Sequence, residues 1–413
     1  MNSEKQSTNL QMTLREVNRV GEGQKNVPKL RFKGYEDAWE QRKLGSEFKK
    51  VNERNDGTFG KGHWISVAKM YFQDPEKVQS NNIDTRTYVM RLGDIAFEGH
   101  PNNEFQFGRF VANDIGDGVV SELFPVYRHN NQYYNNYWKY AIQQERIMAP
   151  IFAKSITSSG NSSNKLDPKH FLRQKIRIAT LEEQKNIGDF LAEIDNLITL
   201  HQRKYDALKL MKKTLLSRMF PKNGEDVPEI RFKGFTDAWE QRKLGEEVQI
   251  VMGQSPKGEN YTDNPEDYIL VQGNADMKEG KVFPRVWTTQ VTKKAYKGDI
   301  ILSVRAPVGD IGKTDYDVVI GRGVAAVKGN EFFYQLLGKL KQDGYWTKSS
   351  TGSTFDSINS NEIKDAKVTI PDANEQLFIG NYFKEMDNLI TLHQRKLDEL
   401  KNMKKTLLQQ MFV

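Results

Sequence analysis

Two segments of the sequence come close to nucleotide-binding loops. Residues 309–314 end in Gly-Lys-Thr, as a phosphate-binding loop does, but such a loop has four residues between its glycines and this segment has two. Residues 321–326 match a loose dinucleotide-binding pattern, yet they lead into β-type sequence rather than into a helix. We therefore predict no nucleotide site in either segment and interpret the second one as a turn.

Residue patterns for metal or nucleophilic catalysis are also missing from the sequence. The chain has no cysteine, and its six histidines show neither metal-ligand spacing nor pairing with a nucleophile. No two prolines are adjacent, so the Pro-Pro-aromatic motif of amino-methyltransferases is absent. We therefore expect that the chain is not an enzyme by itself and that it binds no metal and no cofactor of its own.

Basic and amide side chains among aromatic residues form the pattern that remains. Arg and Asn can each make two hydrogen bonds to a guanine or adenine edge, while Lys neutralises phosphates. The net charge of +7 permits a polyanionic partner without requiring one. For any single residue a solvated surface charge is the commoner role, but together these residues favour nucleic acid as the partner. The candidates are Lys61, Lys69, Arg86, Arg91, Arg109, Arg128, Tyr133 and Tyr134 in the first half of the chain and Lys257, Asn274, Lys278, Arg285, Lys293, Arg305, Lys313, Arg322 and Lys348 in the second.

The candidates lie in two segments that are framed by a duplicated sequence. Residues 195–204 return letter for letter at residues 387–396, and residues 27–45 return with few changes at residues 227–245. The chain is therefore an internal duplication. The segments between the repeats are barely alike, which suggests two surfaces that bind different targets.

Within the two variable segments, β-branched and aromatic runs separated by turn residues predict strands. Residues 93–95 and 298–300, both Gly-Asp-Ile, are expected to occupy equivalent places. We expect the same of residues 116–119 and 321–324, each of which has two glycines followed by valine. The strands are expected to form one mixed α/β domain in each half of the chain.

The repeated stretch predicts a long helix in each copy. Apolar residues recur at steps of three and four residues, no proline interrupts either run, and Pro221 ends the first. We call the face on which they recur the seam. Its residues are Ile187, Leu191, Ile194, Ile198, His201, Tyr205 and Leu208 in the first copy and Ile379, Phe383, Met386, Ile390, His393, Leu397 and Leu400 in the second. At ~1.5 Å per residue each helix would be about 50 Å long. Two helices that each have an apolar face favour an antiparallel pair. We prefer the interpretation that this pair is a rigid spacer to the alternative that it is an ordinary helical hairpin. The two histidines are expected to be polar contacts that set the register of the pair.

The predicted fold class is α+β, with two mixed α/β domains separated by two long antiparallel helices in a pseudo-two-fold arrangement. The predicted parts are a disordered lead (1–26), a first variable domain (27–180), a first spacer helix (181–220), a second variable domain (221–372) and a second spacer helix (373–413). The first residues are polar, and nowhere do 18 apolar residues run together. We therefore expect a cytoplasmic protein without a membrane span.

The duplicated box, the Glu-Gln pairs at 183–184 and 375–376 and the repeated helix motif resemble the specificity subunit of a Type I restriction–modification system. The resemblance covers essentially everything after residue 26. It implies two target-recognition domains, each of which reads half of an asymmetric bipartite site in double-stranded DNA. It also implies partners: two methyltransferase subunits that use S-adenosylmethionine to methylate adenine N6, which dock on the helices, and restriction subunits that translocate DNA with ATP and Mg²⁺.

Two other classes of protein stay open at this point. A stand-alone repressor or architectural protein would bind its DNA site tightly without any methyltransferase. A structural coiled-coil linker would show no sequence-specific DNA binding at all.

Overall fold

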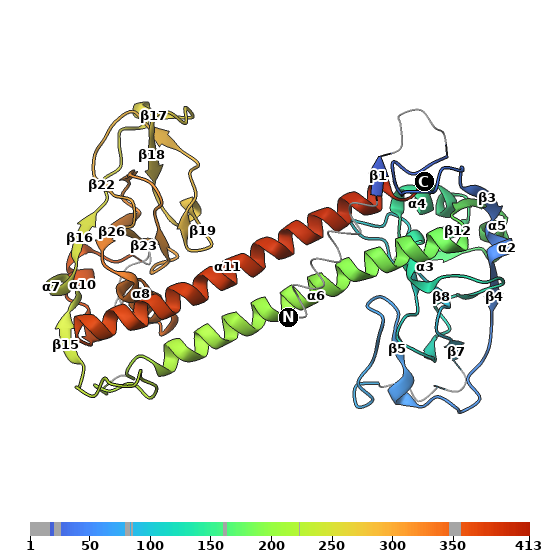
Figure 1. Ribbon diagram of the computed structural model, residues 1–413, viewed down its shortest axis with the longest axis horizontal. Helices are drawn as coiled ribbons and strands as arrows, with labels where there is room; N and C mark the ends of the chain where they lie inside the picture. Colours follow the sequence, from blue (N-terminus) through green and yellow to red (C-terminus); the bar gives the residue numbers. More distant parts are fainter. Residues whose placement is uncertain are drawn as a thin grey trace. The chain divides into compact units, whose positions relative to one another are not determined.

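The computed structural model describes residues 17–19, 26–78, 83, 86–159, 163–222, 224–346 and 357–413. The chain forms two compact units: unit 1 comprises Met1–Gln202 with Arg395–Val413, and unit 2 comprises Arg203–Gln394. Each unit therefore combines one globular domain with half of each long helix (Figure 1). This division differs from the predicted one, in which each spacer helix formed a part of its own.

The globular domain of unit 1 is built around an antiparallel four-stranded sheet with the strand order β4-β11-β8-β9. All four residues of β8 are buried, as a near-continuous apolar run at the centre of a sheet requires. The elements of this domain are β1 (Val17–Arg19), β2 (Leu30–Phe32), β3 (Glu40–Lys43), α2 (Leu44–Glu47), β4 (Phe48–Val51), η1 (Lys61–His63), β5 (Ile65–Ser66), β6 (Tyr71–Phe72), β7 (Thr87–Met90), β8 (Ile95–Glu98), β9 (Arg109–Ala112), β10 (Gly118–Ser121), β11 (Val126–His129), α3 (Asn135–Ala141), α4 (Glu145–Ala153), β12 (Ile156–Ser159), β13 (Asn164–Leu166), α5 (Pro168–Arg173) and β14 (Lys175–Ile178).

The globular domain of unit 2 has two larger sheets, with the orders β16-β26-β23-β24-β20-β19 and β17-β21-β18-β25-β22. Alternate residues of β23 enter different cores, since Ile300 and Leu302 belong to one apolar cluster and Ile301 to another. The elements of this domain are β15 (Glu240–Lys243), α7 (Leu244–Glu247), β16 (Gln249–Met252), η2 (Gly258–Asn260), β17 (Tyr261–Thr262), β18 (Tyr268–Val271), η3 (Asn274–Asp276), β19 (Met277–Lys278), β20 (Lys281–Val282), β21 (Trp287–Thr288), β22 (Lys294–Ala295), β23 (Ile300–Ser303), β24 (Ile311–Lys313), β25 (Val318–Ile320), β26 (Val324–Lys328), α8 (Glu331–Gln342), α10 (Ser360–Lys364) and β27 (Lys367–Ile370).

Strand pairing shows which parts of the two domains correspond. In unit 1, β8 lies between β9 and β11, and β11 also pairs with β4. In unit 2, β23 lies between β24 and β26, and β26 also pairs with β16. The strands β4, β8, β9, β10 and β11 therefore correspond to β16, β23, β24, β25 and β26. The turn at residues 321–323, between β25 and β26, consequently corresponds to residues 122–125. The expected equivalence with residues 116–119 is wrong, because those residues lead into β10 and include its first two residues, whereas residues 321–323 follow β25.

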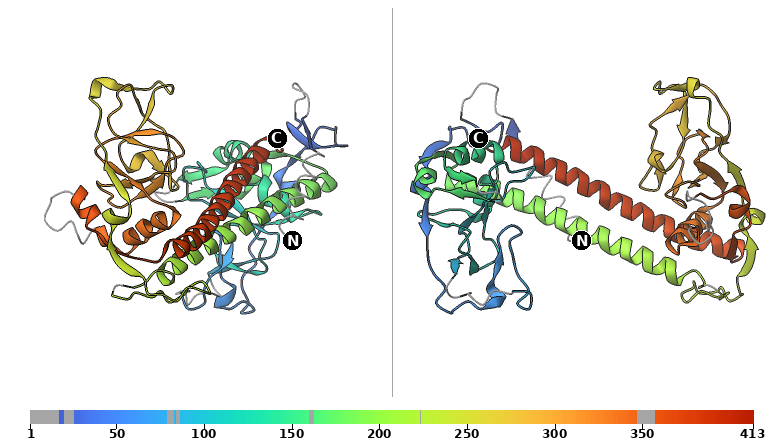
Figure 2. Two further views of the ribbon diagram at one scale, coloured as in Figure 1. Left: turned by 60° about the vertical axis from the view of Figure 1, so that its left-hand side comes forward. Right: turned by 180° about the vertical axis from the view of Figure 1, so that it is seen from behind.

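The two long helices are α6 (Leu181–Arg218) and α11 (Ala373–Gln410), each 38 residues without a break. In unit 1 the first half of α6 shares a core with the second half of α11, through Leu191, Ile194 and Leu407. In unit 2 the second half of α6 shares a core with the first half of α11, through Leu216 and Phe383. The two helices are thus paired antiparallel within each unit, which Figures 1 and 2 show from three sides.

Every predicted seam residue is buried or half-buried, so the seam does face inward. Phe190 and Leu197, which the seam omitted, are buried as well, with 2% of their surface exposed. They are buried because the helix packs on a globular domain as well as on its partner helix, which needs a wider apolar face than a coiled-coil seam. His201 and His393 are half-buried, and their role as register contacts stays a prediction.

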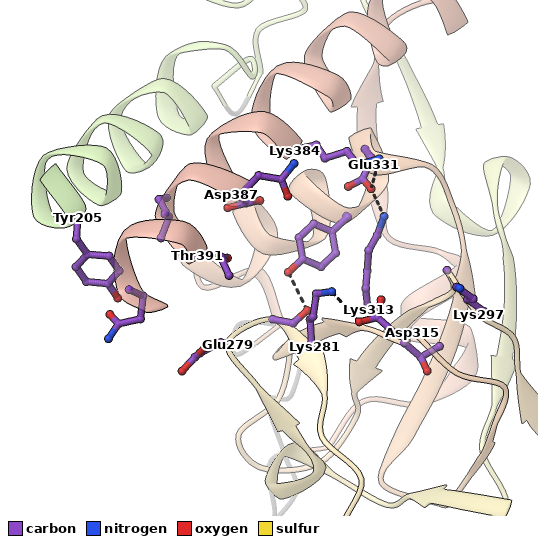
Figure 3. Close-up of a pocket in the computed structure, with 17 residues that line it drawn as sticks. Tyr205, Glu279, Lys281, Lys297, Lys313, Asp315, Glu331, Lys384, Asp387 and Thr391 are labelled. Atoms are coloured by element: carbon purple, nitrogen blue, oxygen red, sulfur yellow. Dashed lines mark hydrogen bonds and ion pairs between the residues drawn. The ribbon is translucent and has the colours of Figure 1, made fainter. Parts of the chain in front are cut away.

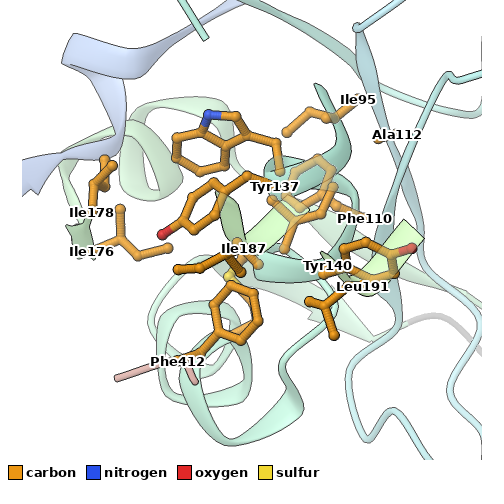
Figure 4. Packing of buried hydrophobic residues seen from close by; sticks show 14 of the residues in the cluster. Ile95, Phe110, Ala112, Tyr137, Tyr140, Ile176, Ile178, Ile187, Leu191 and Phe412 are labelled. Carbon is orange, nitrogen blue, oxygen red and sulfur yellow. The ribbon is translucent and has the colours of Figure 1, made fainter. Parts of the chain in front are cut away.

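A glycine in each long helix allows the globular domain to approach closely. A Cβ atom on Gly188 would lie 2.6 Å from the backbone nitrogen of Tyr137 in α3. A Cβ atom on Gly380 would lie 2.8 Å from the backbone nitrogen of Phe332 in α8. Figure 4 shows the result in unit 1, where Tyr137 lies among Ile187 of α6 and other core residues. The duplication therefore repeats the contact between domain and helix as well as the helix itself.

The prediction of a disordered lead over residues 1–26 is wrong for Val17–Arg19. These residues form β1, which pairs antiparallel with β2. Residues 1–16 and 20–25 lie outside the described part of the chain. In that described part, no helix is both long enough and apolar enough to cross a bilayer.

Candidate nucleic-acid interface

A small polar cavity of about 150 Å³ in unit 2 brings together three of the predicted nucleic-acid contacts. Asn274 lines it from the start of η3, and Arg305 and Arg322 line it from two separate loops. The walls also include Ser255 and Gln272, which sequence reasoning missed. The sequence signal for this cavity is the Gly-Arg-Gly turn at residues 321–323, between two apolar strands, because a tight turn of this kind presents one long basic side chain.

The backbone that carries Arg322 is fixed on both sides. Gly321 donates its N–H to the carbonyl of Val271 at 2.7 Å, and the N–H of Arg322 donates to the hydroxyl of Ser255 at 3.1 Å. A Cβ atom on Gly323 would lie 2.0 Å from the carbonyl oxygen of Gln272, so only glycine fits there. The turn is therefore pressed against the strand end at Gln272, and only the Arg322 side chain is left to move.

The loop that carries Arg305 is anchored in a similar way. The Ser303 hydroxyl donates to the carbonyl of Arg305 at 2.9 Å, and Ile358 donates its N–H to the carbonyl of Val304 at 3.0 Å. Val304 in turn donates to the carbonyl of Gly323 at 2.9 Å. The two arginine loops are thus bonded to each other, and they hold their guanidinium groups at one cavity.

Both guanidinium groups at this cavity are exposed, and among the described residues neither has an acidic partner. An arginine without a carboxylate keeps all five N–H donors available for a planar acceptor such as a base edge or a phosphate. The arrangement can therefore bind an anionic or acceptor-rich ligand without first breaking an ion pair.

Other predicted contacts have partners inside the protein. Arg128 donates through Nε and an Nη to the two oxygens of Asp94, at 2.9 and 2.8 Å. Arg91 forms ion pairs with Glu53 at 2.6 Å and with Asp117 at 3.0 Å. Burial raises the pKa of the Asp94 carboxyl, while the Arg128 guanidinium opposes that shift. These arginines fix strand ends of unit 1, which favours a structural role for them.

Five more predicted residues are also engaged internally. Arg109 and Arg285 donate to the carbonyls of Ala68 and Ala275, respectively. Lys313 forms an ion pair with Glu331. The Tyr133 ring stacks on His129 with 3.8 Å between ring centroids, and the Tyr134 hydroxyl donates to Asp189 of α6. Of the remaining candidates, Lys61, Lys69, Arg86, Lys257, Lys278 and Lys293 are exposed, and Lys348 lies outside the described residues.

The corresponding turn of unit 1 has a different character. It comprises residues 122–125, and Leu123 at its tip is 82% exposed. Glu122 in the same turn forms an ion pair with Arg54 at 2.8 Å, and its N–H donates to the carbonyl of Arg86. The two domains therefore present an arginine and a leucine at equivalent places, so their surfaces have different binding chemistry.

A larger cavity of about 480 Å³ in unit 2 lies where the globular domain meets both long helices (Figure 3). Its walls include Lys281 and Lys313, but these lysines are paired with Asp315 and Glu331. Because the walls carry four acidic side chains for their four lysines, this cavity is a weaker candidate for a polyanion than the one beside Arg322. Among the described residues, no group of His, Cys, Asp and Glu side chains is arranged to hold a metal ion.

A buried contact repeated in both units attaches the duplicated box to its helix. Arg31 and Glu183 form a two-bonded ion pair at 2.6 and 2.9 Å, and the Trp39 indole donates to the same carboxylate at 3.1 Å. Arg231 and Glu375 make the same contact in unit 2, where Trp239 is the indole donor. Both tryptophans are buried and act as packing anchors, and we name this contact the box clasp.

A second repeated contact, the aspartate clasp, joins both helices to the globular domain. Asp195 accepts from Lys404 of the other helix at 2.6 Å and from the Tyr140 hydroxyl of α3 at 2.7 Å. Burial and the nearby Asp195 raise the pKa of Tyr140, so its hydroxyl stays protonated and donates. In unit 2, Asp387 accepts from Lys212 at 2.6 Å and from Gln335 of α8 at 2.9 Å.

The aspartate clasp predicts that two adjacent lysines, Lys404 and Lys405, contribute differently to the free energy of unfolding. Lys404→Gln is expected to lower the free energy of unfolding by about 1–3 kcal/mol, because it removes a charged hydrogen bond and leaves Asp195 half-buried without its cation. Lys405→Gln, at an exposed neighbour, is the matched control and is expected to change little. Urea unfolding followed by circular dichroism measures both values. Equal effects at the two positions would contradict a stabilising role for the clasp.

Comparison with known proteins places this architecture in a family. The family described as Type I restriction modification DNA specificity domain matches this chain at residues 45–210 and again at residues 236–402. The chain belongs to this family of DNA specificity domains, of which it contains two copies.

Named relatives agree with that assignment. The putative type I restriction enzyme MjaX specificity subunit of Methanocaldococcus jannaschii is 28% identical over 366 residues, which cover 83% of this chain and 82% of that protein. The MjaVIII specificity subunit of the same organism is 21% identical over 90% of this chain and 91% of its own length. The crystal structure of a type I restriction–modification S subunit from M. genitalium has the same fold, with a TM-score of 0.62 and 16% identity over 94% of this chain and 99% of that one.

Proposed function

We propose that this chain is the DNA specificity subunit of a Type I restriction–modification complex and that each unit reads one half of an asymmetric bipartite site in double-stranded DNA. The observation that carries the proposal is a repeated scaffold with unlike exposed turns. The box clasp and the aspartate clasp occur in both units, whereas equivalent turns carry Arg322 in one and Leu123 in the other. A scaffold that is repeated while its surface is changed suits two readers of two different sequences.

The family assignment supports a role without catalysis for this chain, since specificity subunits are not enzymes. We propose that the chemistry is supplied by partners: two methyltransferase subunits that transfer a methyl group from S-adenosylmethionine to adenine N6, and restriction subunits that use ATP and Mg²⁺. We also propose that α6 and α11 dock the methyltransferases and set the gap between the half-sites. Both helices pass unbroken from one unit into the other, which supports the second role.

A genome-wide map of N6-methyladenine tests the proposal. Cells that carry this chain with its methyltransferase partner are expected to show a methylated motif with two unlike halves around a fixed gap. Cells that carry the methyltransferase alone are the control and are expected to lack that motif. An assembled complex that adds no motif would contradict the proposal. Tight binding of this chain alone to one DNA sequence would then favour a stand-alone DNA-binding protein.

A further inference from the structure

We propose that Arg322 reads a guanine in the half-site that unit 2 binds, through two hydrogen bonds to the O6 and N7 atoms of that base. This inference rests on the proposed function, because it assigns one base contact within the DNA site. The Arg guanidinium and the guanine edge match in the major groove, where both acceptors of guanine lie side by side. Nothing else on the exposed turn competes for this contact, since glycines flank Arg322 on both sides.

The fixed backbone favours base reading over phosphate binding. A phosphate contact needs only a positive charge within reach, and a flexible lysine or arginine supplies it. The turn at residues 321–323 is instead held by hydrogen bonds to Val271, Ser255 and Val304. A guanidinium on a preorganised backbone loses less conformational entropy when its orientation is fixed, which is what a two-bonded contact demands.

The surroundings of Arg322 add donors and acceptors for the rest of the base pair. Asn274 and Gln272 line the same cavity with amide groups, each able to donate and accept. The Tyr261 hydroxyl donates to the side-chain oxygen of Gln272 at 3.3 Å, which leaves the amide nitrogen of Gln272 as a donor. Arg305 brings a second guanidinium group from the neighbouring loop. A wall of planar polar groups suits the edge of a stacked base pair better than a single phosphate.

Unit 1 cannot make the same contact. Its equivalent turn presents Leu123, which has no hydrogen-bond donor on its side chain, and the nearby Arg54 is paired with Glu122. The guanine read in this way is therefore expected in only one of the two halves of the site.

Charge-conserving variants of the complex with its methyltransferase test the inference. Arg322→Lys keeps the positive charge but loses the planar two-bonded fork. In the methylation map, one guanine of one half-site is expected to become degenerate, with a loss of selectivity at that position of about ten- to a hundredfold. The other half-site and the gap are expected to stay unchanged. Arg242→Lys is the matched control, because Arg242 is an exposed arginine of the same unit that pairs with Glu240 in the duplicated box, and it is expected to keep the wild-type motif.

A measurement on the wild-type complex does not depend on the folding of a variant. Replacing the guanine by 7-deazaguanine in a synthetic site removes the N7 acceptor alone. Binding of the wild-type complex is expected to weaken about tenfold, as for a charged hydrogen bond, while binding of the Arg322→Lys complex is expected to change little.

The possible failures are distinguishable. A bipartite wild-type motif with no guanine in either half would overturn the guanine assignment and leave the proposed function intact. So would an unchanged motif and unchanged methylation in Arg322→Lys, because a phosphate contact needs only the positive charge that this variant keeps. The absence of any bipartite motif in the wild type would remove the proposed function and this inference with it.

Discussion

Glu183→Ala is expected to lower the free energy of unfolding by about 3–5 kcal/mol. Glu183 has no exposed surface, and its partner Arg31 is 4% exposed. The substitution would leave that guanidinium and the Trp39 indole buried without their acceptor, which costs far more than loss of a surface ion pair. Urea unfolding gives the total change, and faster hydrogen exchange over residues 30–44 locates it in the duplicated box.

Two comparisons make this expectation specific. Glu182→Ala, at the exposed preceding residue, is the control and is expected to be nearly neutral. Glu375→Ala in unit 2 is expected to cost less than Glu183→Ala, because Arg231 is 12% exposed and can be hydrated in part. Equal losses for Glu182→Ala and Glu183→Ala would show that the buried ion pair does not stabilise the fold.

A matched insertion of four residues in both long helices is expected to lengthen the gap of the methylated motif by about 2 bp. Four residues add ~6 Å to a helix, and DNA rises ~3.4 Å per base pair. The insertions belong after Leu200 in α6 and after Leu392 in α11, which are equivalent positions of the repeat. Both half-site sequences are expected to be retained, because neither globular domain is altered. The motif in the methylation map gives the gap directly.

An insertion of the same size elsewhere serves as the control. Four residues added after Asn264, in an exposed turn of unit 2, are expected to leave the gap unchanged. An unchanged gap after the helix insertions, or a changed half-site sequence with the same gap, would contradict the idea that the helices measure the spacing.

The long helices and the main strands could be predicted from the sequence because their signals are local. The seam of α6 repeats every three or four residues, and β23 and β26 are short apolar runs between turns. The correspondence of turns was not predictable in this way. Residues 116–119 and 321–324 share glycines and valine, but such turns recur wherever a strand begins or ends, and only strand pairing shows their places.

The candidate interface was predictable only in part, for an electrostatic reason. An arginine that pairs with a carboxylate far away in the sequence looks the same, letter by letter, as one that is unpaired. Arg128 and Asp94 are 34 residues apart, and Arg91 reaches Glu53 at a separation of 38 residues. Asn274, Arg305 and Arg322 were among the candidates named in the second half of the chain, and the structure brings them to one cavity, but nothing in their spacing distinguished them from the arginines that stabilise unit 1.

The two clasps also bear on how such a protein acquires a new specificity. The groups of the box clasp, Arg31, Trp39 and Glu183, recur as Arg231, Trp239 and Glu375 in sequence common to both copies. The segment between box and helix is therefore expected to be exchangeable as a cassette, provided that it keeps a donor to the helix aspartate, as Tyr140 and Gln335 are, and that the box and helix keep the groups of the box clasp. The same cassette would fit either position of the chain. With two attachment sites of the same kind, a small number of recognition domains could be combined into many ordered pairs, and each pair would have its own bipartite target.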